Sequence, residues 1–315
     1  MSAMKMLPLA LAASLLAGTA AQAQLFRAYL TSTGSDANPC TLQQPCRLLP
    51  AALNAVAEGG EIWMLDSANY NSATVNVNKS VSILAVPGVV GSVVATGGPA
   101  ISISAAGKTV ALRNLVIAPV VTLPPGTSGV AMSVPSNLII ENSVIANLPE
   151  AGVVVQGAGT LKITSSTLRN IGGYAIVLGD GARGAIASTQ LLDNLGTGGF
   201  GGGLLVFSAT ATTTTASLSD SVISGGPQGV WAYSYVNGSV ARISVTRSTI
   251  QKTTTALYSR STGGSAEVNF GSSLIIDNQN AWSQENAGST ILSLGDNQLR
   301  GNAGSSGTKT ALPPQ

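Results

Sequence analysis

Short apolar runs separated by small and polar residues extend along most of the chain. The runs are rich in Gly, Thr and β-branched residues, which favour strands over helices. One pattern recurs: an apolar residue, two or three small or polar residues, and an apolar residue that closes a strand. It occurs at residues 112–117, 140–145, 163–168, 186–191, 218–223, 245–250, 270–275 and 294–299. The closing residues are about 26 residues apart on average, a period typical of solenoids.

A further strand follows the repeat and usually begins with Gly, as at residues 152–156, 203–207 and 229–233. Three short strands per repeat predict one coil of a parallel β-helix. A single coil cannot bury its apolar side chains, so successive coils stack at about 4.8 Å and build a continuous core. Less regular coils begin near residue 62. We therefore predict an all-β fold, a parallel β-helix over residues 59–302.

The two ends of this solenoid have a different composition. Residues 48–57 favour a helix that stops at Gly59 and Gly60, and such a helix would cover the first coil. We assign residues 24–58 to an N-terminal cap. Residues 303–315 contain Gly, Ser and Pro and are expected to form a flexible tail.

The first 23 residues predict a signal peptide. Lys5 supplies a positive start, an apolar core follows, and Ala21 to Ala23 form a small-x-small cleavage motif. Cleavage near Ala23 would place the protein in the periplasm or outside the cell. The apolar stretch at residues 81–95 is interrupted by Pro87 and two Gly residues, so we expect no membrane span.

Cys40 and Cys46 are the only cysteines. An even number of cysteines in an exported chain predicts a disulfide. Two thiols without any His make a poor zinc site. A redox-active pair would have two intervening residues, whereas five intervene here.

Charged residues make up only 9% of the chain and aromatic residues 4%. A soluble domain usually has about 25% charged residues, so this composition excludes a coiled coil and a disordered polyelectrolyte. Fifteen basic and 13 acidic residues give a net charge of +2, so we expect no nucleic-acid partner. The chain has no His. This excludes His-based catalysis and His-ligated metals, and we expect no cofactor and no metal.

Residues 29–40, together with Pro45, Cys46 and Arg47, resemble the N-terminal cap of exported right-handed parallel β-helix proteins of the pectin-lyase-like group. Residues 60–65 and 77–83 resemble the coils that follow that cap. The resemblance covers essentially the whole mature chain and implies a single-stranded, right-handed parallel β-helix. It implies fold rather than activity, since this fold supports lyases, hydrolases and adhesins.

The chemistries of that group need particular residues. A hydrolase similar to polygalacturonase needs an acid and a base carboxylate within about 10 Å. Beside the Gly-initiated strand we find only Asp180 and Glu285, four coils or about 19 Å apart. A lyase needs a cation and a basic residue. Arg183 and Arg260 are available, but no Asp cluster that would hold Ca²⁺ accompanies them. We therefore assign no catalytic residue.

Several polar residues occupy equivalent positions on neighbouring coils. Asn147, Asn170 and Asp193 share one position on three coils, which favours a ladder of side-chain hydrogen bonds over a metal-binding column. Opposite charges also coincide and predict ion pairs. These pairs are Arg113 with Glu141, Asp220 with Arg247, and Lys252 with Asp277.

Alternation along the Gly-initiated strand predicts which side chains face outward. If Val153 and Val155 point inward, the outward pairs are Ile176 and Leu178, Leu205 and Phe207, Trp231 and Tyr233, Leu257 and Ser259, and Trp282 and Gln284. Aromatic rings then line one face. Either corner loops 196–203 and 236–238 bury them, or they stack on sugar rings or dock a partner.

We take this face as the candidate ligand-binding surface, with Trp282 and Trp231 about 9.6 Å apart along the axis. Its candidate residues are Trp231, Tyr233, Trp282, Phe207 and Arg260. We expect a non-catalytic protein that binds a polysaccharide or a surface. The alternative is a polysaccharide lyase or glycoside hydrolase with an unconventional active site.

Overall fold

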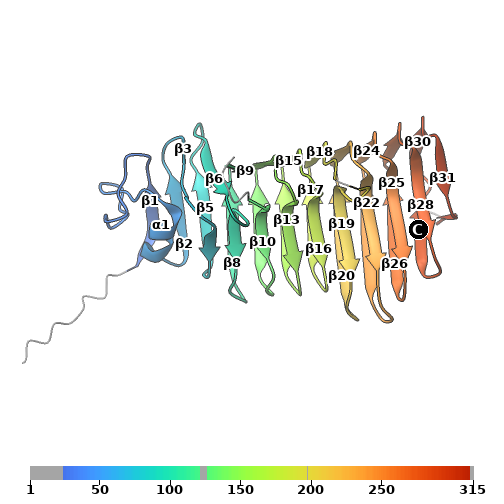
Figure 1. The fold of residues 1–315 in the computed structure, drawn as a ribbon, viewed down its shortest axis with the longest axis horizontal. Coiled ribbons are helices and arrows are strands. Elements are labelled where there is room, and N and C mark those ends of the chain that lie inside the picture. Colours follow the sequence, from blue (N-terminus) through green and yellow to red (C-terminus); the bar gives the residue numbers. More distant parts are fainter. Residues whose placement is uncertain (1–23, 121–125, 197, 313–315) are drawn as a thin grey trace, which may run out of the picture.

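The computed structural model describes residues 24–120, 126–196 and 198–312. Within them the chain winds into a parallel β-solenoid whose strands stack along one long axis (Figure 1). The predicted signal peptide, residues 1–23, lies outside the described residues. Each full turn contributes one strand to each of three sheets, which we call sheets A, B and C. All pairings between neighbouring rungs are parallel, as in β10 to β13 or β11 to β14. The predicted all-β parallel β-helix is therefore confirmed.

The strands of each sheet are given in spatial order. Sheet A has 12 strands: β1 (Leu25–Leu30), β2 (Val56–Met64), β5 (Val81–Ala85), β8 (Thr109–Arg113), β11 (Asn137–Glu141), β14 (Thr160–Thr164), β17 (Arg183–Ala187), β20 (Thr213–Ser219), β23 (Val240–Thr246), β26 (Ser265–Gly271), β29 (Ser289–Ser293) and β32 (Lys309–Ala311). Sheet B has 10 strands: β3 (Ala68–Asn69), β6 (Gly91–Ala95), β9 (Leu115–Pro119), β12 (Val144–Ala146), β15 (Thr167–Arg169), β18 (Gln190–Leu192), β21 (Val222–Ser224), β24 (Thr249–Gln251), β27 (Leu274–Ile276) and β30 (Gln298–Arg300). Sheet C also has 10 strands: β4 (Val75–Val77), β7 (Ile101–Ile103), β10 (Ser128–Met132), β13 (Ala151–Gln156), β16 (Tyr174–Gly179), β19 (Gly202–Ser208), β22 (Gln228–Ser234), β25 (Thr255–Ser261), β28 (Asn280–Glu285) and β31 (Gly304–Ser306).

The closing residues of the predicted repeat form one column inside sheet B. Each pairs in register with its equivalent on the next rung. All of them are fully buried except Leu299, which packs against the core at its C-terminal end. This register explains the repeat, because a side chain in the column is removed from water only when its neighbours above and below are apolar. The column consists of Ile117, Ile145, Leu168, Leu191, Ile223, Ile250, Ile275 and Leu299.

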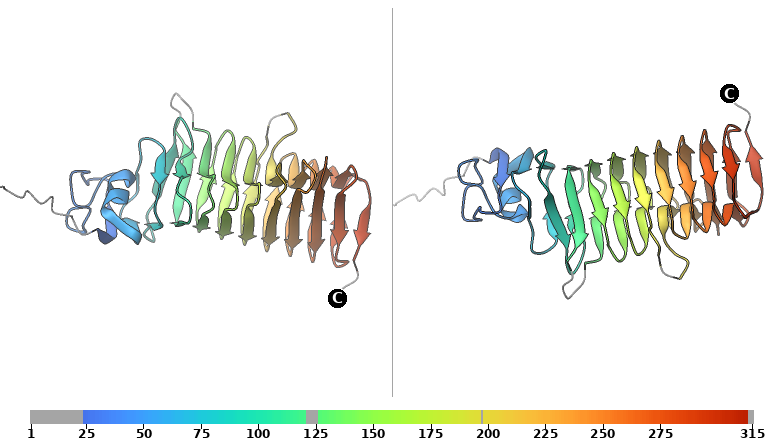
Figure 2. Two further views of the ribbon diagram at one scale, coloured as in Figure 1. Left: turned by 90° about the horizontal axis from the view of Figure 1, so that it is seen from below. Right: turned by 90° about the horizontal axis from the view of Figure 1, so that it is seen from above.

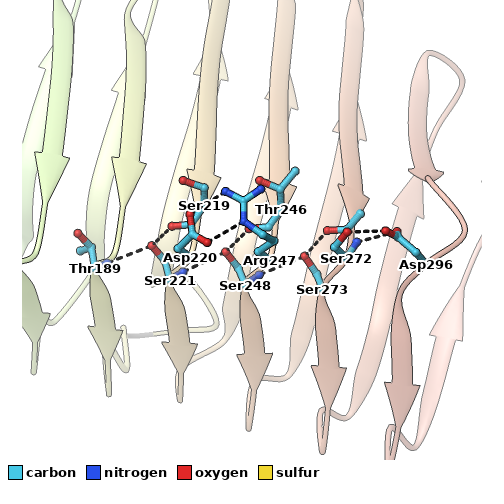
Figure 3. A network of polar contacts seen from close by, with 11 residues as sticks. Thr189, Ser219, Asp220, Ser221, Thr246, Arg247, Ser248, Ser272, Ser273 and Asp296 are labelled. Carbon is cyan, nitrogen blue, oxygen red and sulfur yellow. Dashed lines mark hydrogen bonds and ion pairs between the residues drawn. The ribbon is translucent and has the colours of Figure 1, made fainter. Parts of the chain in front are cut away.

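A ladder of buried hydroxyls forms the corner between sheets A and B (Figure 3). The backbone N–H of Thr189 donates to the hydroxyl oxygen of Ser221 on the next rung, at 3.1 Å, and that hydroxyl donates to the carbonyl of Ser219. Ser248 repeats the arrangement for Ser221, at 3.2 Å. The hydroxyls therefore satisfy backbone groups that the tight corner removes from both sheets.

The corner between sheets B and C carries the predicted amide ladder. Asn147, Asn170 and Asp193 all have positive φ angles, a conformation that Asn and Asp tolerate better than most residues. The side-chain amide of Asn170 donates to the side-chain oxygen of Asn147 at 3.2 Å. The hydrogen-bond interpretation of this column is confirmed for that pair.

A helix and a disulfide lie at the N-terminal end of the solenoid. Helix α1 (Leu49–Ala55) buries Leu49, Ala52 and Leu53 against the first rung. It is shorter than the predicted 48–57, because Val56 already adopts an extended conformation and begins β2. Cys40 and Cys46 form the predicted disulfide. Within the described residues, no helix has the length and apolarity needed to cross a membrane.

At the C-terminal end, the structure corrects the expected flexible tail. Residues 304–306 form β31 and residues 309–311 form β32, which pair with β28 and β29. These strands extend the stack at the red end in Figure 2. Their small and polar side chains suggested a tail, but the ladder requires only backbone N–H and C=O groups, which any non-proline residue supplies.

Candidate functional site

Aromatic side chains gather on the outer side of sheet C. The chain has three Trp, six Tyr and four Phe residues. Seven of these 13 contact one another over strands β16, β19, β22 and β25 and the loops beside them. We call this cluster the aromatic face: Tyr174, Phe200, Phe207, Trp231, Tyr233, Tyr235 and Tyr258.

Trp231 lies at the centre of the aromatic face. Its ring is nearly parallel to those of Tyr233 and Tyr258, with centroids 5.3 and 5.0 Å away and planes 10° and 16° apart. The ring of Tyr235 stacks on that of Tyr233, with centroids 3.7 Å apart. These contacts follow from the register, because Trp231 pairs with Tyr258 across the sheet and Tyr233 is the next outward residue on β22.

A loop covers part of this face. Trp231 is only 4% exposed, since Phe200, in the segment between β18 and β19, places its ring 6.1 Å from the indole. Gln228 connects this segment to the sheet: it accepts a hydrogen bond from the Tyr174 hydroxyl and donates one to the carbonyl of Gly199. Phe200 itself is 63% exposed and Tyr235 42% exposed. Of the two alternatives that the sequence left open, burial under a corner loop therefore applies to Trp231, which is not accessible to a ligand, while other rings remain accessible.

One ion pair lies beside the rings. Arg260 Nε is 3.6 Å from a carboxylate oxygen of Glu285 on the next strand, and the guanidinium lies 5.3 Å from the Tyr233 ring centroid. Burial raises the pKa of the Tyr258 hydroxyl, and the nearby Glu285 carboxylate raises it further. Tyr258 is therefore a protonated hydrogen-bond donor at neutral pH.

Two donors on this face have no acceptor among the residues that the structure describes. They are the indole Nε1 of Trp231 and the Nε of Arg260, and both are buried. Arg260 and Glu285 are too far apart for a hydrogen bond between the paired atoms, although their charges attract. Both N–H groups are covered, so the accessible polar group of this face is the remainder of the Arg260 side chain, which is 37% exposed.

The predicted outward register is right on three rungs and wrong on three. Strand pairing places three residues in one outer column, Phe207, Tyr233 and Arg260, and two in another, Leu205 and Trp231. For the residues of β19 and β22, this outward orientation agrees with the prediction. The structure contradicts the outward assignment of six other residues, which belong to the inward columns of β16, β25 and β28: Ile176, Leu178, Leu257, Ser259, Trp282 and Gln284.

The error comes from a column of small residues. Gly152, Gly203 and Gly229 occupy it on the rungs where the prediction is right. Ala175, Ala256 and Ala281 occupy it on the three other rungs. The register carried forward from the Gly-initiated strands is therefore off by one residue on these rungs, and a shift of one residue exchanges the two faces of a strand.

Trp282 consequently lies apart from the aromatic face. It pairs with the buried Leu257, packs against the C-terminal end of the core, and donates from Nε1 to the carbonyl of Gly307. The predicted platform of Trp231 and Trp282 on one face is wrong. Sequence reasoning also missed four members of the aromatic face: Tyr174, Phe200, Tyr235 and Tyr258. Of these, Tyr258 follows directly from the corrected register.

The acidic residues agree with the spacing expected from the sequence. Asp180 follows β16 and Glu285 ends β28, four strands away in sheet C. Asp180 accepts hydrogen bonds from the backbone N–H groups of Ala209 and Thr210. In the described ranges, no group of three or more His, Cys, Asp or Glu side chains is arranged to hold a metal ion.

Two of the three predicted ion pairs across rungs are present. Arg113 and Glu141 approach to 2.7 Å, and Asp220 and Arg247 to 2.8 Å. Lys252 and Asp277 instead line one open cavity of about 470 Å³.

Comparison with known proteins agrees with this architecture. A family model described as "Right handed beta helix region" matches residues 67–250. No curated protein matches the chain in sequence.

Similar solved structures include XylC in complex with xylose, with 10% identity, a TM-score of 0.64, and coverage of 87% of this chain and 70% of that one. The pectate lyase Pel9A has 14% identity and a TM-score of 0.52, with 91% and 80% covered. A polygalacturonase from Erwinia carotovora has 11% identity and a TM-score of 0.50, with 93% and 98% covered. At these identities the similarity shows a common fold.

Proposed function

This chain belongs to the right-handed β-helix family, and we propose that it binds a polysaccharide through the aromatic face without altering it chemically. The observation that carries the proposal is the combination of accessible rings and an accessible guanidinium group at one place. Phe200 and Tyr235 expose much of their surface, and the Arg260 side chain, beside the Tyr233 ring, is 37% exposed. Sugars offer both complements, since C–H groups pack on aromatic rings and ring or hydroxyl oxygens accept hydrogen bonds.

The comparison proteins support the choice of ligand class. They include a pectate lyase, a polygalacturonase and a protein that holds xylose. A sugar chain is therefore a ligand that this fold accommodates. For this chain, the ligand class remains part of our proposal, because it shares only 10–14% identity with them.

We also propose that the protein acts outside the cytoplasm. A disulfide persists in oxidising compartments, and Cys40 and Cys46 form one. The signal peptide predicted at residues 1–23 fits the same location. Mass spectrometry of the exported protein should find an N-terminus at Gln24, and a protein retained in the cytoplasm with residue 1 intact would contradict export.

A catalytic alternative has one observation in its favour. Acidic and basic side chains do meet on the outer side of sheet C, where Arg260, Glu285 and Tyr258 lie together. A lyase, however, needs a group that accepts a proton, and burial keeps Tyr258 protonated because its pKa is raised. Glu285 is one carboxylate where a hydrolase of this fold requires two. Binding is therefore the better-supported function.

Affinity electrophoresis in gels that contain xylan, glucomannan, pectate or alginate tests binding. We expect retardation in at least one gel and its loss in Tyr235→Ala and Phe200→Ala. Phe26→Ala is the matched control, because Phe26 is 66% exposed and lies at the first strand, away from the aromatic face. Equal retardation of all three variants would contradict the proposed site. Release of unsaturated products or new reducing ends by the purified protein would favour the catalytic alternative.

A further inference from the structure

The outer side of sheet C carries almost no charge. The 10 strands of this sheet contain two charged residues in total, Arg260 and Glu285. The strands of sheet A, in the same solenoid, contain 10: Arg27, Glu58, Glu61, Arg113, Glu141, Lys162, Arg183, Arg242, Glu267 and Lys309. The strands of sheet B also contain two, Arg169 and Arg300, so the charged strand residues of this solenoid lie mainly on sheet A, and sheets B and C carry few.

The two charged residues of sheet C also neutralise each other. Arg260 and Glu285 lie on adjacent strands with their closest charged atoms 3.6 Å apart. Asp180, at the turn after β16, adds one negative charge at the edge of the aromatic face. A polyuronate brings one carboxylate per sugar unit and would meet no cation without an acidic partner on the described strands of sheet C, which disfavours its binding.

The neighbouring outward positions are apolar. Ala131, Val154, Val177 and Leu205 pair in register on successive rungs and lead directly to Trp231. All four side chains face outward and are partly exposed. The aromatic face therefore continues as a strip of uncharged side chains along the solenoid axis, long enough to follow an extended ligand over several rungs.

We infer that this face is specific for neutral polysaccharide chains and rejects polyuronates. The inference rests on the proposed function and adds the ligand class to it. Phe200 and Tyr235 pack on the C–H faces of the sugar units, and hydroxyl oxygens accept hydrogen bonds from the exposed part of the Arg260 side chain. Such a ligand needs no counter-charge, so its affinity depends little on salt.

Isothermal titration calorimetry tests this specificity. The neutral probes are xylohexaose, cellohexaose and mannohexaose, and the acidic probes are hexagalacturonate and hexamannuronate, each at 50 and 500 mM NaCl. We expect at least one neutral probe to bind with a Kd that changes less than twofold between the two salt concentrations. Both acidic probes should bind at least tenfold more weakly. If an acidic probe binds as tightly as the best neutral one, and Tyr235→Ala abolishes that binding, the inference is overturned and the proposed function stands. No binding by any probe overturns both.

A charge variant gives an independent test. Glu285→Gln leaves Arg260 without its acidic partner, so the affinity for hexagalacturonate should rise several-fold at 50 mM NaCl and less at 500 mM. The matched control is Glu267→Gln, which removes the partner of Arg242 on sheet A, where the closest charged atoms are 4.0 Å apart. The control should leave hexagalacturonate binding unchanged. The assignment of specificity to this face is contradicted if Glu285→Gln does not raise the affinity for hexagalacturonate. It is also contradicted if Glu267→Gln raises that affinity equally.

Discussion

Trp231 and Tyr258 stack across two neighbouring strands of sheet C, with ring centroids 5.0 Å apart and planes inclined by 16°. Parallel strands in register place equivalent side chains one rung apart, and this spacing suits stacked rings. Trp231 is thereby fixed from several sides, by Tyr258, Tyr233 and Phe200. Trp231 is buried although it lies on the outward face, so its main role is to hold the accessible rings in position.

Trp231→Ala should therefore reduce stability as well as binding. Removing a well-packed buried aromatic side chain costs about 3 kcal/mol, whereas Tyr235→Ala, at a position 42% exposed, should cost less than about 1 kcal/mol. Urea denaturation followed by circular dichroism measures both variants. Equal unfolding midpoints for Trp231→Ala and wild type would show that the indole is not packed as described.

The hydroxyl ladder between sheets A and B makes a separate prediction. Ser248→Ala removes the acceptor of the Ser221 N–H, which then remains buried without a partner at a cost of about 1–3 kcal/mol. Ser217→Ala is the matched control on the exposed side of β20 and should change the free energy of unfolding by less than about 0.5 kcal/mol. If denaturation midpoints of the two variants coincide, the ladder contributes nothing measurable.

The disulfide should stabilise the N-terminal end of the solenoid. It closes a short loop, with a sequence separation of six, so chain entropy predicts a contribution of about 2 kcal/mol. Cys40→Ser should lower the thermal midpoint and increase hydrogen exchange in β1 and β2 more than in β26 and β29. A thiol assay on the exported protein should detect no free cysteine, and two reactive thiols would contradict the bridge.

Stability should be almost independent of pH around neutrality. Hydrogen bonds from Arg247 lower the pKa of Asp220, and those from Ser272 lower the pKa of Asp296. Stability from a lowered carboxyl pKa is present above the unfolded value, near 4, and is lost as pH falls through the folded value. Burial raises the pKa values of Tyr70 and Tyr174. That stability is present below the unfolded value, near 10, and is lost as pH rises through the folded value.

Because the chain has no His, we expect a flat thermal midpoint from about pH 5.5 to 9 and a decrease on either side. Circular dichroism melts in buffers of constant ionic strength measure this profile. A clear change of the midpoint between pH 6 and 8 would contradict the description of the titrating groups.

The repeat was predictable from the sequence because its signal is repeated. Ile145, Leu168 and Leu191 recur at similar spacing, so a wrong assignment of any one of them would still leave the repeat recognisable. The outward register had no such redundancy. On each rung of sheet C it depended on one position, and with Ala256 and Ala281 there in place of Gly the prediction turned Tyr258 inward and Trp282 outward. In the folded chain, pairing with the neighbouring rung decides the register. The sequence of one strand alone does not determine that pairing.

The loop over Trp231 was beyond prediction for a different reason. Phe200 lies in a Gly-rich segment, where backbone conformation follows contacts with Gln228 and Tyr174 rather than local preference. The sequence identified this segment as a possible cover without indicating which ring it would bury. The ion pair of Arg260 and Glu285 likewise required the correct register.

Fluorescence of a protein that retains Trp231 as its sole tryptophan tests the central claim most directly. In the variant with Trp63→Phe and Trp282→Phe, all tryptophan emission comes from the aromatic face. Titration with the neutral hexasaccharides should shift or quench this emission with a saturable dependence on concentration, and the response should disappear when Tyr235→Ala is added. An emission spectrum that stays unchanged while calorimetry records binding would place the sugar elsewhere and contradict a polysaccharide site on the outer face of sheet C.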